Sequence, residues 1–96
     1  MVHRAYGDLM ADLRDDVVEA LKPLRKSAFF LVCTTEEDGE NFIQKYRFSS
    51  GINFIVDVVE DYINLSVWDN GNLKEFSTFL TPAKVFKRCL EWLGKE

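Results

Sequence analysis

Four turn-like segments divide residues 28–79 into five pieces of strand length, and this spacing constrains the fold more than any other feature of the sequence. Asn70-Gly71 is the strongest turn signal, because both residue types tolerate the positive φ of a two-residue type I′ hairpin. Glu60-Asp61 is the weakest, since neither residue favours that geometry. The predicted strands are Ala28–Thr35, Asn41–Phe48, Ile52–Val59, Tyr62–Asp69 and Leu73–Phe79. Short turns between successive strands predict an antiparallel meander.

The register of these hairpins is self-consistent. Two-residue loops at Asn70-Gly71 and Glu60-Asp61, with a three-residue loop at Ser49–Gly51, bring the large apolar residues to one face. In this register Leu65 pairs with Phe76. The predicted apolar face holds Phe42, Tyr46, Phe48, Ile52, Phe54, Val56, Val58, Ile63, Leu65, Val67 and Phe76.

A helix is predicted on each side of the strands. The first begins near Asp8, has apolar residues at spacings of three and four, and ends at Lys22, because Pro23 disfavours helix in the residue before it. The last has Thr81 as N-cap and Pro82 in its first turn, and it ends at Gly94. The sequence therefore predicts one α+β domain over residues 1–96, with both helices packed on the apolar sheet face.

Composition limits the classes of partner and compartment. The net charge of −4 argues against nucleic acid as the partner, because phosphate-binding domains usually carry a basic excess. No apolar run approaches the roughly 18 residues that cross a bilayer, and the N-terminus lacks a signal-peptide pattern. We therefore expect a soluble, cytoplasmic protein without a membrane partner. Cys33 and Cys89 lie in core-like segments and are expected to be free buried thiols.

No catalytic or metal-binding constellation emerges from the residue pattern. His3 is the only histidine, which leaves a zinc site without ligands. The acidic segment Glu36–Glu40 and the segment Asp69–Asn72 match no calcium loop, and each is better explained as a hairpin tip. We therefore expect a protein that is not an enzyme and has no cofactor.

The second face of the predicted sheet carries the strongest functional signal. It mixes aromatic, aliphatic and basic residues, whereas a solvated sheet face is mostly polar. Its expected members include Phe30, Val32 and Glu75. The residues predicted to bind a protein partner are Tyr62, Trp68, Phe79, Ile55, Arg47, Lys45 and Leu73.

The first helix offers a second candidate surface. Its non-core side carries acidic residues, several at four-residue spacing, namely Asp8, Asp12, Asp15, Asp16 and Glu19. Such like-charge pairs destabilise an isolated helix. Either the basic residues of the last helix compensate, or the acids bind a basic partner protein. Those basic residues are Lys84, Lys87, Arg88 and Lys95.

These features favour a small, non-catalytic protein-interaction domain of the inhibitor, immunity-type or adaptor kind. The expected partner is a second copy, forming a homodimer through the open sheet face, or another protein, basic if it meets the acidic helix. Single-stranded nucleic acid stacked on the same aromatic face is an alternative, which the acidic net charge disfavours. Another alternative is a small molecule between sheet and helices, beside the inward-facing Gln44 and Tyr46.

Overall fold

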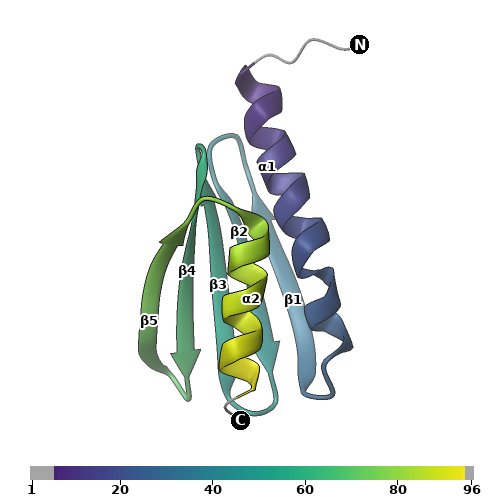
Figure 1. Cartoon of the computed structure of the whole chain (residues 1–96), viewed down its shortest axis with the longest axis vertical. Coiled ribbons are helices and arrows are strands. Elements are labelled where there is room, and N and C mark those ends of the chain that lie inside the picture. Colours follow the sequence, from purple (N-terminus) through teal and green to yellow (C-terminus); the bar gives the residue numbers. More distant parts are fainter. Residues whose placement is uncertain (1–5, 95–96) are drawn as a thin grey trace.

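A computed structural model describes the backbone of residues 6–94 and the side chains of residues 13–94. It contains a helix, a short 3-10 helix, a five-stranded sheet and a second helix, in that order along the chain (Figure 1). The elements are α1 (Tyr6–Leu21), η1 (Lys22–Lys26), β1 (Phe30–Glu37), β2 (Phe42–Phe48), β3 (Ile52–Val59), β4 (Tyr62–Asp69), β5 (Asn72–Phe79) and α2 (Pro82–Leu93). The predicted α+β meander between two helices is therefore confirmed.

The five strands form one antiparallel sheet in the order β1-β2-β3-β4-β5. The central register is as predicted: Tyr46 faces Phe54, and Leu65 faces Val56. Asn70 and Gly71 have φ values of 50° and 85°, as a type I′ hairpin requires. The weaker turn signal also holds, because Glu60 takes a positive φ of 51° and closes a two-residue loop.

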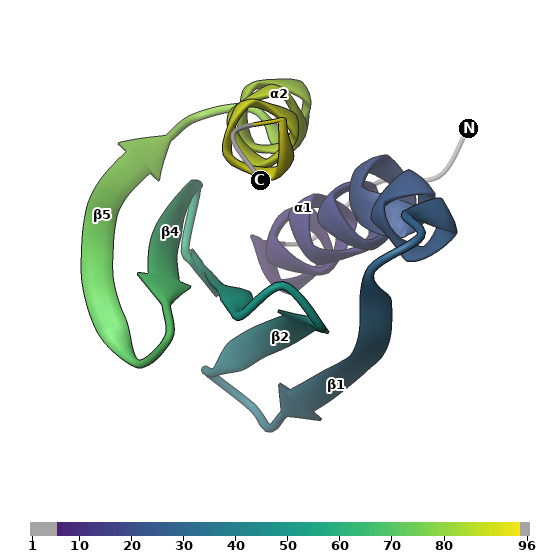
Figure 2. The same cartoon turned by 90° about the horizontal axis from the view of Figure 1, so that it is seen from below.

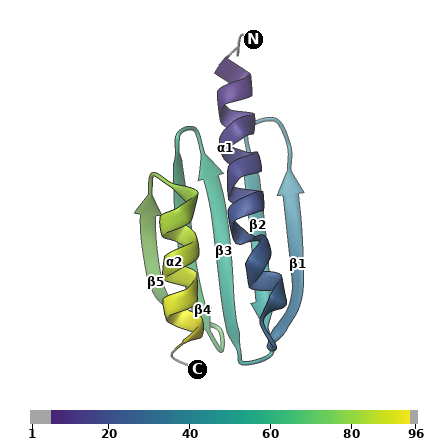
Figure 3. The ribbon, with the colours of Figure 1, turned by 45° about the vertical axis from the view of Figure 1, so that its right-hand side comes forward.

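Both helices lie on one side of the sheet, which curls around them (Figure 2). Figure 3 shows α1 and α2 side by side in front of the strands, and the first turns of α1 extend past the end of the sheet. We call the covered, concave side the inner face and the opposite, convex side the outer face. The core between helices and inner face contains Val17, Leu21, Leu24, Phe42, Tyr46, Phe48, Ile52, Phe54, Val56, Val58, Ile63, Leu65, Val67, Val85 and Cys89.

The ends of the helices follow from local sequence. Pro23 stops the α-helix at Leu21, and the chain continues as the 3-10 helix η1. Leu24 in η1 is buried, so this segment contributes to the core. Thr81 occupies the N-cap position of α2 without a side-chain capping bond, and Pro82 begins the helix.

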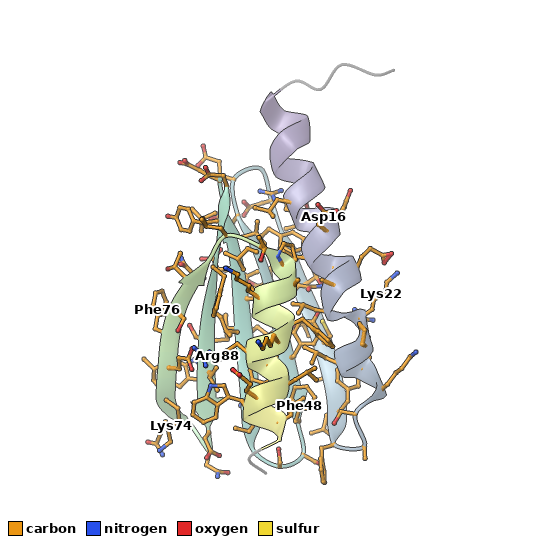
Figure 4. The ribbon with its side chains drawn as sticks, viewed as in Figure 1. Asp16, Lys22, Phe48, Lys74, Phe76 and Arg88 are labelled. Atoms are coloured by element: carbon orange, nitrogen blue, oxygen red, sulfur yellow. The ribbon has the colours of Figure 1, made fainter. Side chains whose placement is uncertain are left out.

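A bulge in β5 overturns part of the predicted register. Val67 faces Glu75 and Trp68 faces Leu73, so Lys74 is an extra residue on β5. Such a residue shifts the rest of its strand by one position, which moves each later side chain to the other face. Phe76 was predicted in the core but is 62% exposed on the outer face (Figure 4). Glu75 and Phe79, both expected on the outer face, lie on the inner face.

A second bulge lies in β1, the other edge strand. Phe30 faces Phe48 and Val32 faces Arg47, which leaves Leu31 between them unpaired. The predicted outer placement of Phe30 is therefore wrong: its ring packs edge-on against Phe48 on the inner side, 5.9 Å between centroids. Val32 lies on the outer face as predicted. Bulges on edge strands increase local twist and hinder pairing with another sheet.

Candidate functional site

The outer face consists of side chains arranged in rows across the strands. One row near the β4–β5 turn contains Val32, Arg47, Asn53, Trp68 and Leu73. The next row contains Thr34, Lys45, Ile55, Ser66 and Phe76. We call these two rows together the Trp68 surface. No described element covers it, because both helices lie on the inner face.

A shallow hollow of about 430 Å³ lies within the Trp68 surface. It extends over β2, β3 and β4 to the turn before β5. The residues lining it are Lys45, Arg47, Asn53, Ile55, Trp68 and Gly71. Four of the seven residues predicted to bind a protein partner are thus brought together in one depression.

The hollow has one basic side and one apolar side. Lys45 and Arg47 are exposed on β2, and neither makes an ion pair or hydrogen bond with the described residues. Trp68 and Ile55 are partly buried and supply aromatic and aliphatic surface. The chain has a net charge of −4, so these two unpaired cations form a local positive site on an acidic protein.

Trp68 also holds an unused hydrogen-bond donor. Its Nε1–H is shielded from solvent and has no acceptor within the described part of the chain. A buried donor without an acceptor carries a desolvation cost of about 1–3 kcal/mol. The other described tryptophan differs: Trp92 on α2 donates its Nε1–H to Glu75 Oε1 at 2.8 Å.

The remaining predicted residues are placed differently. Leu73 is 51% exposed and faces Trp68, which extends the apolar side of the hollow to β5. Tyr62 lies on the outer face at the opposite end of β4, opposite Val59, and does not line the hollow. Phe79 packs against the core from the inner face and is therefore not part of the site on the outer face.

Several residues in and around the hollow were not predicted as part of the site. Asn53 was placed on the correct face but not assigned to the site, although its row neighbours are Arg47 and Trp68. Gly71 lines the hollow from the turn, a position that only the three-dimensional structure reveals. Phe76 was assigned to the core because nothing in the sequence marks the bulge at Lys74.

The acidic side of α1 is solvent-exposed at Asp15, Asp16 and Glu19. Lys22 pairs with Glu19 across one helical turn at 2.6 Å.

Asp8 and Asp12 belong to α1, but their side chains, like those of His3 and Lys95, lie outside the described residues. Among described side chains, no ion pair links α1 to the basic residues of α2. Arg88 instead binds Glu75 on β5 and Glu91 on its own helix (Figure 4).

The inward-facing polar residues are used within the fold. Tyr46 donates its hydroxyl to Gln44 Oε1 at 2.7 Å, and Gln44 Nε2 donates to Thr35 Oγ1 at 3.1 Å. Burial, with the nearby Cys33 thiol, raises the pKa of Tyr46 and keeps its hydroxyl protonated. These groups satisfy one another, which removes the main support for a ligand between sheet and helices.

Within residues 13–94, no cluster of three or more His, Cys, Asp or Glu side chains is arranged to hold a metal ion. No helix in that part of the chain is both long enough and apolar enough to span a membrane.

Comparisons with models of protein families, with curated proteins and with solved structures found no match. Function is therefore inferred from the geometry and chemistry of this chain.

Proposed function

We propose that this protein is a non-catalytic protein-interaction domain and that the Trp68 surface is its binding site. The observation that supports this most strongly is the hollow on a sheet face that no described element covers. It combines an indole, an aliphatic side chain and two cations that have no ion-pair partner among the described residues. Tryptophan and arginine are the side chains most enriched among residues that dominate binding energy at protein interfaces.

Exposed apolar residues continue the site beyond the hollow. Leu73 and Phe76 on β5 are 51% and 62% exposed and extend the apolar side of the hollow, whereas Val32, 39% exposed, lies beyond Arg47 at the other edge of the surface. Contiguous apolar surface rimmed by polar groups is typical of interaction sites on soluble proteins. A role as an inhibitor, immunity-type protein or adaptor requires no more than such a surface. We also propose a cytoplasmic location, since Cys33 and Cys89 are free thiols, as is usual in a reducing compartment.

A second copy of the chain is one partner that this proposal includes. Two convex faces, however, meet mainly along their central strands, which limits the area that a face-to-face homodimer buries. Light scattering across a range of protein concentrations tests self-association directly. A dimer that dissociates on Trp68→Ala substitution identifies the partner as a second copy.

Site-specific photo-crosslinking in the native cell tests the proposal for any protein partner. A photoreactive phenylalanine analogue at position 68 is expected to form one dominant protein adduct. The matched control carries the analogue at Leu90, an exposed apolar residue of α2. Absence of any adduct at position 68, or the same adducts at both positions, overturns the proposed surface.

Single-stranded nucleic acid is the second candidate, supported by the position of Trp68 beside Lys45 and Arg47. Bases stack on aromatic side chains while cations contact phosphates. Only these two cations line the hollow, and the neighbouring row of the outer face carries Glu36 and Asp57. Titration of a fluorescent oligothymidine at several salt concentrations tests this candidate, because phosphate contacts give a steep salt dependence.

A further inference from the structure

We propose that the hollow binds an extended acidic segment of a partner protein, with a carboxylate between Lys45 and Arg47 and an apolar side chain against Trp68 and Ile55. This inference rests on the proposed function and specifies the chemistry of the partner. It makes use of both sides of the hollow, the basic side on β2 and the apolar side on β3 and β4.

Charge complementarity is the first argument for this occupant. Lys45 and Arg47 are separated by one residue on β2, so both side chains emerge on the outer face, about 7 Å apart along the strand. Neither has a carboxylate partner among the described residues. An acidic segment supplies the missing counter-charges, and because the protein is acidic overall, their attraction is local to this site.

The spacing of the strands indicates the pattern of the segment. Neighbouring strands lie about 4.8 Å apart, and in an extended peptide alternate residues face the same side about 7 Å apart. A segment that crosses from β2 toward β4 therefore places a carboxylate at Arg47 and, two residues later, a side chain over Ile55 and Trp68. The predicted motif is an acidic residue followed two positions later by an apolar one.

The surroundings of the hollow restrict other occupants. A small inorganic anion uses the two cations but leaves Trp68 and Ile55 without contacts. A nucleic acid strand needs more cations along its path, whereas the adjacent row of the outer face presents Glu36 and Asp57. A second copy that docks through the same face presents its own Lys45 and Arg47 and another convex surface in place of carboxylates.

Trp68 gives a specific way to observe the complex. Its Nε1–H has no acceptor among the described residues, whereas the Trp92 Nε1–H is bonded to Glu75 on the inner face. The two indole signals in a ¹H–¹⁵N NMR spectrum therefore report on opposite faces of the sheet, and Trp92 serves as an internal control.

Three capped peptides separate the contributions to binding. The test peptide is Gly-Ser-Glu-Ser-Phe-Ser-Gly; the second replaces the glutamate by glutamine, and the third replaces phenylalanine by alanine. We expect the test peptide to shift the Trp68 indole signal without shifting that of Trp92. Each replacement is expected to weaken binding by about ten-fold.

A protein variant provides the reciprocal measurement. In the double variant Lys45→Gln with Arg47→Gln, both side chains are exposed and without described ion pairs, so the fold is retained. This variant is expected to bind the glutamate and glutamine peptides equally. Retention of a ten-fold preference for glutamate overturns the assignment of the two cations.

The outcomes distinguish this inference from the proposed function. Equal binding of the glutamate and glutamine peptides by the natural chain overturns the acidic preference but leaves the Trp68 surface as an interface. No shift of Trp68 with any peptide overturns the inference, and photo-crosslinking at position 68 still decides the proposed function. Tighter binding of oligothymidine than of the test peptide, or a Trp68 shift on concentrating the protein alone, overturns it in favour of nucleic acid or a second copy.

Discussion

Arg14 on α1 donates from Nη1 to Glu37 Oε2 at 2.9 Å, and this contact attaches the helix to the last residue of β1. Its Nη2 donates to the carbonyl of Gly39 at 3.3 Å, and its guanidinium lies 5.6 Å from the centroid of the Phe42 ring. Arg14 is 8% exposed although it belongs to a strongly acidic helix. The acidic β1–β2 turn thus has a structural role, because it binds the arginine of α1.

Arg14→Ala is expected to lower the free energy of unfolding by about 1–2 kcal/mol, through loss of packing on Phe42 and of charged hydrogen bonds. Glu37→Gln is expected to cost less than about 1 kcal/mol, because the Glu37 side chain is half exposed. Urea denaturation of the two variants and the natural chain measures both effects. If both variants lose the same free energy of unfolding, this account is contradicted, because the ion pair alone then explains the stabilisation.

Gly51 and Asn70 are in close contact at the ends of two neighbouring hairpins. Gly51 has a φ of 99°, and a Cβ atom added there clashes with Asn70 Oδ1. Gly51→Ala is therefore expected to destabilise the fold by more than about 1 kcal/mol, through backbone strain and the clash together. Thermal unfolding measures the loss.

Asn70→Gly separates the two causes, because it removes the Asn70 side chain while glycine accepts the local φ of 50°. In the Asn70→Gly background, Gly51→Ala is expected to lower the free energy of unfolding by less than it does in the natural chain. If the loss of unfolding free energy is the same in both backgrounds, backbone strain accounts for the whole effect and the clash with Asn70 contributes nothing.

The register of β5 can be tested through Phe76. Because this side chain is 62% exposed, Phe76→Ser is expected to change the free energy of unfolding by no more than about 0.5 kcal/mol. For comparison, Phe54→Ala at a fully buried ring is expected to lower the free energy of unfolding by about 3–5 kcal/mol. Chemical denaturation compares them. A loss from Phe76→Ser approaching that of Phe54→Ala shows that Phe76 is in the core and that the bulge is absent.

The central strands were predictable because two signals agree there. The bounds of β3 and β4 match the prediction, since alternating apolar residues and short turns both determine the register. Trp68, Ile55, Lys45 and Arg47 all lie on β2, β3 or β4, and their outer position follows from that alternation.

The edge strands were less predictable, since their bulges lie at Leu31 and Lys74, two residues that carry no glycine-like signal. Because of the bulges, three phenylalanines lie on the face opposite to the predicted one, namely Phe30, Phe76 and Phe79. Arg14 was missed for a different reason: its partners come from a hairpin more than twenty residues away, and helical spacing alone does not place them. Contacts of this kind depend on how α1 packs against the sheet.

Cys89 predicts how stability depends on alkaline pH. Burial, with a smaller effect of Glu75, raises the pKa of its thiol above the ordinary value of 9.0, so the folded state keeps the proton when the unfolded state has lost it. The unfolded state then binds fewer protons, and the free energy of unfolding falls as pH rises above about 9, by at most about 1.4 kcal/mol per pH unit for this group. Urea denaturation between about pH 8 and 10 measures the slope. The range stops at pH 10 because the pKa of Tyr46 is raised in the same way, and this residue adds its own effect above its ordinary value of 10.0.

Cys89→Ala is the control for this prediction. It is expected to be less stable at neutral pH, because a buried group is removed, and to show a smaller loss between pH 8 and 10. Cys33 is only partly buried, so iodoacetamide is expected to modify it before Cys89 in the native protein. If Cys89→Ala retains the full alkaline slope, or if Cys89 is alkylated as fast as Cys33, then the thiol is not held protonated by burial between α2 and the inner face.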